Sequence, residues 1–269
     1  MMKKIAAYLP AALLLAVVPF ASAQTFPKSV QKQAEGRSSN PGAATAEAPP
    51  QSLADREAAL KALFAEIWQD RLQHEPEFAS SIGDKRYNDQ LTDYSVAAYN
   101  DALARGRDDL LRLGAIDTTG MTGQETLSQE LMVRELIDQQ EEAEFKPWEM
   151  PMTQFDGIQI DLPELVSLLS FSTAKDYDDY TARLNKIPVA IQQVTNNATQ
   201  GIEDGRVPPK FILQKVLAQV NNIATKKPED TPFAEPLKKF PAGVSAADQQ
   251  RIRAEVLKAI QTEVLPAYQ

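Results

Sequence analysis

From Leu53 to the end of the chain, large apolar residues recur at the three- and four-residue intervals of an α-helix. No segment alternates apolar and polar residues in the way that a half-buried strand does. The stretch from Gly201 to Gln219 shows how successive helices are joined. Gly205 can adopt the left-handed conformation that ends one helix, and Pro208 and Pro209 suit the beginning of the next. The pattern therefore predicts an all-α fold, an irregular multi-helix domain.

Capping residues predict where individual helices begin and end. Before several expected helices, a Ser, Thr or Asp is followed three positions later by an acidic residue. These pairs are Thr122 with Glu125, Asp161 with Glu164, and Ser245 with Asp248. The residues expected to end helices are Pro76, Gly114 and Gly205. Asp161 and Glu164, on either side of Pro163, predict that the short helix PELVSLLSF begins at this proline.

The segment from Lys146 to Ile160 differs from the helices around it. Its two prolines and one glycine make it too irregular for a helix, and it is too apolar for a solvated loop. We expect it to cross the domain and to bury Trp148 and Phe155. Other aromatic and apolar residues expected in the core are Tyr177, Tyr180, Phe233, Leu237 and Phe240.

Charge and residue counts exclude several classes of function. The chain carries 28 basic and 37 acidic residues, a net charge of −9, which argues against a nucleic-acid-binding protein, since such a protein needs a basic surface. There is no cysteine, so disulfides, thiolate zinc sites and cysteine nucleophiles are excluded. The single histidine, His74, excludes a zinc site with two histidines from this chain.

No motif in the chain predicts a catalytic centre. His74 and Glu75 look like the start of the zinc-binding motif HExxH, but Pro76 breaks the helix and Phe78 stands where the second histidine is needed. We expect His74 to be an exposed residue at a helix end. There is no GxSxG turn and no glycine-rich phosphate loop. The sequence therefore predicts no catalytic residue and no metal ligand.

Three regions follow one another along the chain. Residues 1–23 resemble a signal peptide, with a basic start, an apolar stretch and a cleavage site after Ala23. The apolar stretch has about sixteen residues, short of the roughly 20 that span a bilayer. The composition of residues 24–52 predicts a disordered linker or, alternatively, a proline-rich docking motif. The helical domain is expected to span residues 53–269. We expect export to a bacterial periplasm, with no stable membrane anchor.

The order of several segments resembles the N-terminal half of the bacterial family called domain of unknown function 885. The resemblance covers about residues 53–269. Its segments are EPEFASSIGDKRYNDQLTDYS, MPMTQFDGIQIDLPEL, DYDDYTARLNKIPVAIQQ, GIEDGRVPPKFILQKVLAQV, TPFAEPLKKFP and AEVLKAIQTEVLPAYQ. The resemblance implies a mostly helical fold similar to zinc metallopeptidases, with the HExxH helix and a further glutamate ligand in the C-terminal half of the family.

What the resemblance implies for this chain is a scaffold. The final EVLPAYQ stops within an amphipathic pattern, so we expect a truncated chain that is inactive alone. Zinc and a peptide substrate are then expected only in the full-length protein. The irregular segment with Gln154, Asp156 and Gly157 is expected to approach the substrate cleft. Truncation also predicts that the last helix and the region near Trp148 expose an apolar patch.

A second function stays open beside the peptidase scaffold. The chain can equally be a non-catalytic helical module that binds a partner in the periplasm, with an unknown oligomeric state. The coding sequence after position 269 distinguishes the two, because an HExxH motif there supports truncation. A stop codon behind a well-folded protein supports the binding module.

Overall fold

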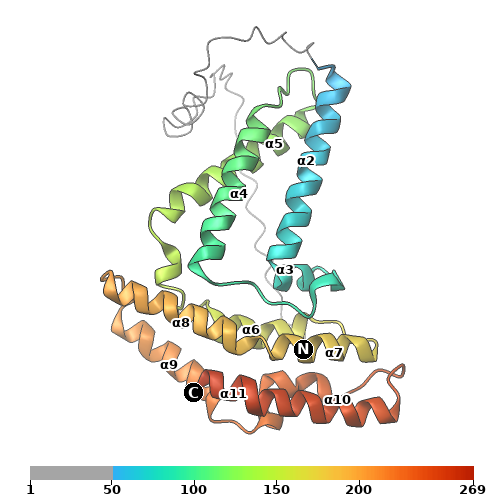
Figure 1. Cartoon of the computed structure of the whole chain (residues 1–269), viewed down its shortest axis with the longest axis vertical. Helices are drawn as coiled ribbons and strands as arrows, with labels where there is room; N and C mark the ends of the chain where they lie inside the picture. The colour runs from blue at the N-terminus through green and yellow to red at the C-terminus, as the bar shows by residue number, and fades with distance from the viewer. Residues whose placement is uncertain (1–50) are drawn as a thin grey trace, which may run out of the picture. The chain divides into compact units, whose positions relative to one another are not determined.

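The computed structural model describes residues 51–269, which contain helices and no strand (Figure 1). The all-α prediction is confirmed for this part of the chain. The predicted signal peptide, residues 1–23, and residues 24–50 of the predicted linker lie outside the described residues. The first described helix begins at Leu53, where Ser52 and Asp55 form a capping box.

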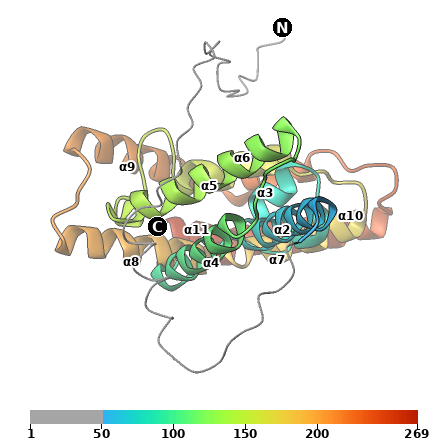
Figure 2. The ribbon, with the colours of Figure 1, turned by 90° about the horizontal axis from the view of Figure 1, so that it is seen from above.

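Three long helices form the first part of the domain. They are α2 (Leu53–His74), α4 (Val96–Gly114) and α5 (Gly123–Ala143). Their shared hydrophobic core consists of Leu60, Leu63, Leu110, Leu113 and Leu136. The predicted capping box is confirmed, since the Thr122 hydroxyl accepts a hydrogen bond from the Glu125 N–H. Figure 2 shows α2, α4 and α5 from above.

A short connection joins α2 to α4. It contains α3 (Pro76–Ser81) and the 3₁₀ turn η1 (Lys85–Tyr87). Arg183, only 2% exposed, holds this connection from the other part of the domain. Its guanidinium donates hydrogen bonds to the carbonyls of Gln90 and Tyr87 at 2.7 and 2.8 Å, and to the Ser80 hydroxyl at 2.9 Å.

The remaining elements build a second and larger core. The helices are α6 (Ile158–Leu168), α7 (Ala174–Leu184), α8 (Ile187–Glu203), α9 (Lys210–Ala224), α10 (Ala246–Ala259) and α11 (Leu265–Tyr268). The shorter turns are η2 (Pro147–Glu149), η3 (Pro228–Asp230), η4 (Pro232–Leu237) and the π-helical η5 (Ile260–Val264). Tyr177, Tyr180 and Phe233 are buried here as predicted, and the Tyr180 hydroxyl donates to the Phe233 carbonyl at 2.8 Å.

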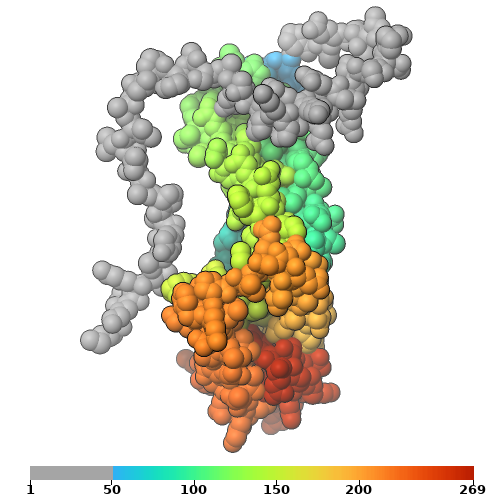
Figure 3. Space-filling view, turned by 90° about the vertical axis from the view of Figure 1, so that its left-hand side faces the viewer, coloured from blue at the N-terminus to red at the C-terminus, as the bar shows by residue number. Residues whose placement is uncertain are grey.

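The last helix does not expose the apolar patch that truncation predicts. Ile260 and Val264 are fully buried, and Tyr268 is 6% exposed. The reason is packing, because α11 contacts both α8 and α9, and α10 contacts α7. Figure 3 shows the red end of the chain lying against the orange segment that contains α9. The apolar side of the chain end therefore has its partners within residues 51–269.

Two further predictions about local structure are wrong. Helix α6 begins at Ile158, not at Asp161, because Gly157 at φ +121° lets the chain turn directly into the helix, and Pro163 lies inside it. Phe155 is 82% exposed instead of buried, since it lies at the tip of a turn. Trp148 is only half-buried and stacks on Tyr99, with ring centroids 5.4 Å apart.

Exposed apolar side chains occur on α9 and, as predicted, near Trp148, where Phe145 is 70% and Met150 42% exposed, rather than at the chain end. Phe211 and Leu217 are 60% and 59% exposed, whereas Val216 and Ile223 are buried. The expected apolar face of this helix therefore reaches the core only in part.

Candidate functional site

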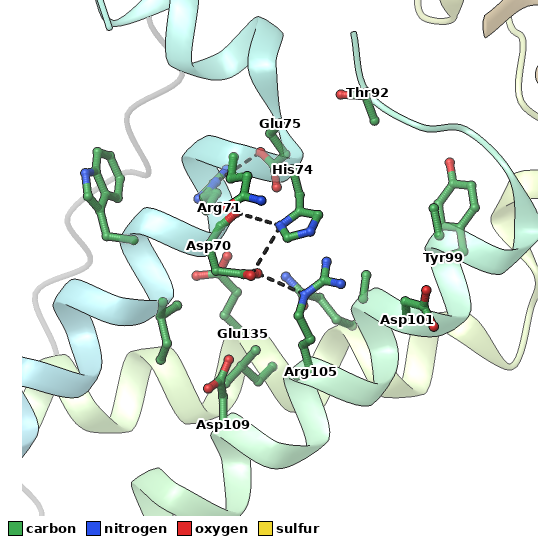
Figure 4. A pocket seen from close by; sticks show the side chains of 18 of the residues that line it. Asp70, Arg71, His74, Glu75, Thr92, Tyr99, Asp101, Arg105, Asp109 and Glu135 are labelled. Atoms are coloured by element: carbon green, nitrogen blue, oxygen red, sulfur yellow. Dashed lines mark hydrogen bonds and ion pairs between the residues drawn. The ribbon is translucent and has the colours of Figure 1, made fainter. Parts of the chain in front are cut away.

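A cavity of about 1010 Å³ lies between α2, α4 and α5. Figure 4 shows part of its lining, with side chains from all three helices and from the segment before α4. This volume is at the upper end of the range that ligand pockets occupy. The cavity is open to solvent, and both charged and aromatic side chains line it.

The cavity exists because α2 and α4 diverge. They pack together near Leu60 and Leu113 and separate toward the end of α2 that carries His74 (Figure 1). Small residues on α4 line this space, and the buried Gly106 among them also lets α5 pack closely, since a Cβ atom there would lie 3.2 Å from the Gln140 Nε2. Ala98, Ala102 and Gly106, spaced four residues apart on one face of α4, all line the cavity.

A polar network joins the two diverging helices across the cavity. The Arg105 Nε on α4 donates to the Asp70 Oδ2 on α2 at 3.0 Å. The His74 Nδ1 lies 3.2 Å from the Asp70 Oδ1 and 2.9 Å from the Asp70 carbonyl oxygen. In Figure 4 these three side chains meet at the centre of the cavity wall. His74 is exposed, as predicted from its place at the helix end.

Burial changes the acid–base behaviour of two lining residues. Burial raises the pKa of the Asp109 carboxyl, although Arg112, 3.5 Å away, acts in the opposite direction. Burial also raises the pKa of the Tyr99 hydroxyl. At neutral pH Tyr99 is therefore uncharged, and its ring presents an aromatic surface supported from behind by Trp148.

The residues predicted from sequence to approach a substrate cleft do not line this cavity. Gln154, Asp156 and Gly157 belong to a turn in which the Thr153 N–H donates to the Asp156 carbonyl at 2.9 Å. The turn is attached to α9, since the Gln219 side-chain amide donates to the Gln154 carbonyl at 3.1 Å. Asp156 points to solvent and Gln154 is half-buried.

The residues at the cavity do not fit a zinc site. Zinc in proteins is usually held by three or four histidine, cysteine or carboxylate ligands in tetrahedral geometry. Within residues 51–269 no three such side chains are grouped so that they could hold a metal ion. His74 has only Asp70 as a neighbouring ligand type within hydrogen-bond range. No step that needs a metal can therefore be assigned to these residues.

The sequence predicted none of the cavity residues as a site. Asp70, His74 and Arg105 come from two helices separated by more than twenty residues, and no motif connects them. One signal was present: Ala98, Ala102 and Gly106 leave one face of a long helix without large side chains. Small residues at this spacing also occur where two helices pack closely, so the signal alone does not predict a cavity.

Among the helices of residues 51–269, none is both long and apolar enough to cross a bilayer. The described part is thus an all-α protein with an open cavity lined by charged and aromatic side chains. The chain belongs to the family of bacterial proteins of unknown function DUF885, whose model matches residues 76–269. The family resemblance is confirmed, and its relationship to zinc metallopeptidases stays a prediction.

A solved structure shares the fold. The crystal structure of a candidate lipoprotein from Colwellia psychrerythraea is similar over 79% of this chain, with a TM-score of 0.68 and 17% sequence identity. The match covers 40% of that protein, so the present chain spans well under half of its length. At this identity the similarity shows the fold alone. Comparison with curated protein sequences gave no match.

Proposed function

We propose that residues 51–269 form the scaffold and a peptide-binding wall of an exported protein related to zinc metallopeptidases. The observation that carries the proposal is the cavity of about 1010 Å³ between α2, α4 and α5. Its mixed lining suits a peptide, because aromatic rings can cover apolar side chains while carboxylates and amides bind the polar groups. Zinc and the catalytic groups belong to the remainder of the family fold.

Two observations support the division between a binding wall and a separate catalytic part. The similar protein from Colwellia psychrerythraea is more than twice as long as the region matched here. The donor groups of residues 51–269 do not fit a zinc site. The alternative, a non-catalytic binding module of the periplasm, uses the same cavity and differs only in lacking a catalytic partner.

Export is part of the proposal. It rests on the signal-peptide pattern of residues 1–23, and the mass of the protein recovered from a bacterial host tests it. Cleavage after Ala23 predicts a chain that begins at Gln24. A protein that retains Met1 and stays with the cytoplasmic fraction would contradict export.

The turn with Gln154, Asp156 and Gly157 is proposed as a second contact region for the substrate. It presents Phe155, which is 82% exposed, and the carboxylate of Asp156 to solvent. Substituting alanine at Gln154 and Asp156 in a family member that carries the HExxH motif is expected to impair peptide turnover. Unchanged kinetics would remove this turn from the proposal.

The cavity itself is tested by filling it. Ala102 lines the cavity and is exposed, so Ala102→Trp can occupy the space without disturbing the core. Ala104, on the same helix and also exposed, does not line the cavity, and Ala104→Trp is the matched control. We expect a mixed peptide library to bind the unmodified protein and Ala104→Trp, and to lose binding to Ala102→Trp. Equal binding by all three proteins would exclude the cavity.

A second measurement tests where catalysis occurs. Purified protein is compared with a family member that includes the HExxH motif, by zinc content and by peptide cleavage. We expect cleavage and stoichiometric zinc only in the longer protein. Cleavage by the present chain in the presence of a chelator would instead show a metal-independent hydrolase within these residues.

A further inference from the structure

The cavity carries an excess of negative charge. Six carboxylates line it, against two arginines and His74. Both arginines are already paired within the wall, Arg71 with Glu75 and Arg105 with Asp70, each at 3.0 Å. The charge of each arginine is therefore balanced by a carboxylate of the same wall.

Three of the carboxylates have no ion-pair partner within residues 51–269. They are Asp93 before α4, Asp101 on α4 and Glu135 on α5. They lie on three different segments of the lining, and Asp93 accepts hydrogen bonds from the Ser95 N–H and the Gln193 side-chain amide. Figure 4 shows Asp101 on the α4 wall and Glu135 on the α5 wall. A cation in the cavity would be attracted by the excess negative charge of the lining as a whole.

Aromatic side chains accompany this negative charge. Phe64 and Trp68 line the cavity from α2, and Tyr99 lines it from α4. Trp68 is 43% exposed, although burying its large apolar ring would be favourable. This exposure indicates that the ring surface is available to a ligand. Aromatic rings bind the hydrocarbon part of a lysine or arginine side chain and attract its charged end through the face of the ring.

We infer that the cavity binds an extended peptide through a basic side chain, a lysine or an arginine. The inference deepens the proposed function and depends on it. The carboxylates of Asp101 and Glu135 contribute the negative charge that attracts the ammonium or guanidinium group, and the aromatic rings of the lining contact apolar parts of the peptide. The Asp70–Arg105 pair orders the wall between them.

The same observations argue against two other cations. A metal ion needs several ligands grouped around one point, and residues 51–269 contain no such group of three. A small free amine would occupy little of a cavity of about 1010 Å³ and would leave the aromatic wall uncovered. A peptide fills the volume and covers both kinds of surface.

The experiment measures binding of three fluorescent peptides of equal length by anisotropy. Their sequences are identical except for a central residue pair, which is Lys-Arg, Gln-Gln or Glu-Glu. We expect the basic peptide to bind at least about tenfold more tightly than the neutral one, and the acidic peptide to bind most weakly. Added salt is expected to weaken binding of the basic peptide selectively.

Charge-neutralising variants locate the effect. Asp101→Asn combined with Glu135→Gln removes two cavity charges, and both positions are exposed, so folding is expected to be unaffected. Glu130→Gln combined with Asp138→Asn removes two exposed charges of α5 that do not line the cavity. We expect the first pair of substitutions to lower the affinity for the basic peptide by about five- to tenfold. The second pair is expected to change this affinity by less than twofold.

The possible outcomes separate the two proposals. Equal binding of all three peptides, abolished by Ala102→Trp, would keep the cavity as a peptide site and overturn its preference for basic residues. Binding of none of the peptides would overturn the proposed function together with this inference. Spermidine that displaces the basic peptide at an equal or lower concentration than unlabelled peptide does would overturn the assignment to a peptide.

Discussion

Arg105 donates a hydrogen bond to Asp70 across the cavity, with 3.0 Å between the Arg105 Nε and the Asp70 Oδ2. The pair joins α4 to α2 where the two helices have diverged and no hydrophobic core connects them. The two side chains are 36% and 41% exposed, so water and salt weaken their attraction. Their main effect is therefore to orient the cavity wall rather than to stabilise the fold.

The first prediction concerns this pair. Arg105→Met and Asp70→Asn, alone and together, are expected to show a coupling free energy below about 1 kcal/mol in a double-mutant cycle. Urea denaturation of the four proteins gives the coupling. Peptide binding is expected to weaken in the single variants at unchanged stability. A coupling of several kcal/mol would instead make the pair a major stabilising contact.

The second prediction concerns the contact between α8 and η2. A Cβ atom on Gly201 would lie 2.1 Å from the Glu149 carbonyl oxygen and 3.0 Å from that of Arg206. Gly201→Ala must therefore separate α8 from η2, and it is expected to destabilise the protein by about 1 to 3 kcal/mol. Gly123→Ala, which meets no atom within 4 Å, is the control and is expected to be neutral or stabilising. Equal thermal stability of both variants would contradict the tight contact.

The third prediction concerns Arg183. Its guanidinium is buried away from water, and this burial lowers its pKa. Arg183→Met leaves the buried Ser80 hydroxyl and the partly buried carbonyls of Tyr87 and Gln90 without their donor. The free energy of unfolding is expected to fall by about 2 to 3 kcal/mol, and the backbone amides of residues 80–91 are expected to exchange hydrogen faster. Arg134→Met on the exposed face of α5 is the control, with an expected change within about 0.5 kcal/mol.

The fourth prediction concerns pH. Burial alone would raise the pKa of the Asp176 carboxyl, but the Lys85 ammonium and the N–H groups of Ser172 and Thr173 outweigh it, so the pKa is lowered. A carboxyl with a lowered pKa in the folded state stabilises the protein above its unfolded pKa, about 3.9, and this contribution is lost as pH falls through the folded value.

Asp176→Asn is therefore expected to destabilise the protein at pH 7 and to approach the stability of the unmodified protein below about pH 4. Thermal unfolding between pH 3 and pH 7 measures the difference. Asp138→Asn, an exposed partner of Arg134, is the control and is expected to show a small difference at every pH. A difference for Asp176→Asn that is constant with pH would exclude the ionic contribution.

Much of the fold could be predicted because helix signals are local. The caps at Thr122 and Ser245 need only residues three positions apart, and both are present in the structure. The cap predicted at Asp161 is wrong because Gly157, four residues earlier, takes a positive φ and begins the helix first. Periodicity does not show which of two adjacent possible starts the backbone uses.

Burial was harder to predict than helix position. Phe155 and Val264 are both large apolar residues, yet one is 82% exposed and the other is fully buried. The difference depends on whether another segment packs over them, and for Val264 that segment includes α8, more than fifty residues earlier. A hydrophobic side chain specifies that burial is favourable, but not that a partner is present.

By itself, the sequence determined the all-α class, most helix boundaries, the absence of cysteine chemistry and the resemblance to the DUF885 family, because these depend on residue identity and short spacings. Only the tertiary structure decided that α2 and α4 diverge, that the end of the chain is packed, and that Asp70, Arg105 and Glu135 share one cavity. These features depend on contacts between residues far apart in sequence. Such contacts are selected by the packing of the whole domain, which no local pattern encodes.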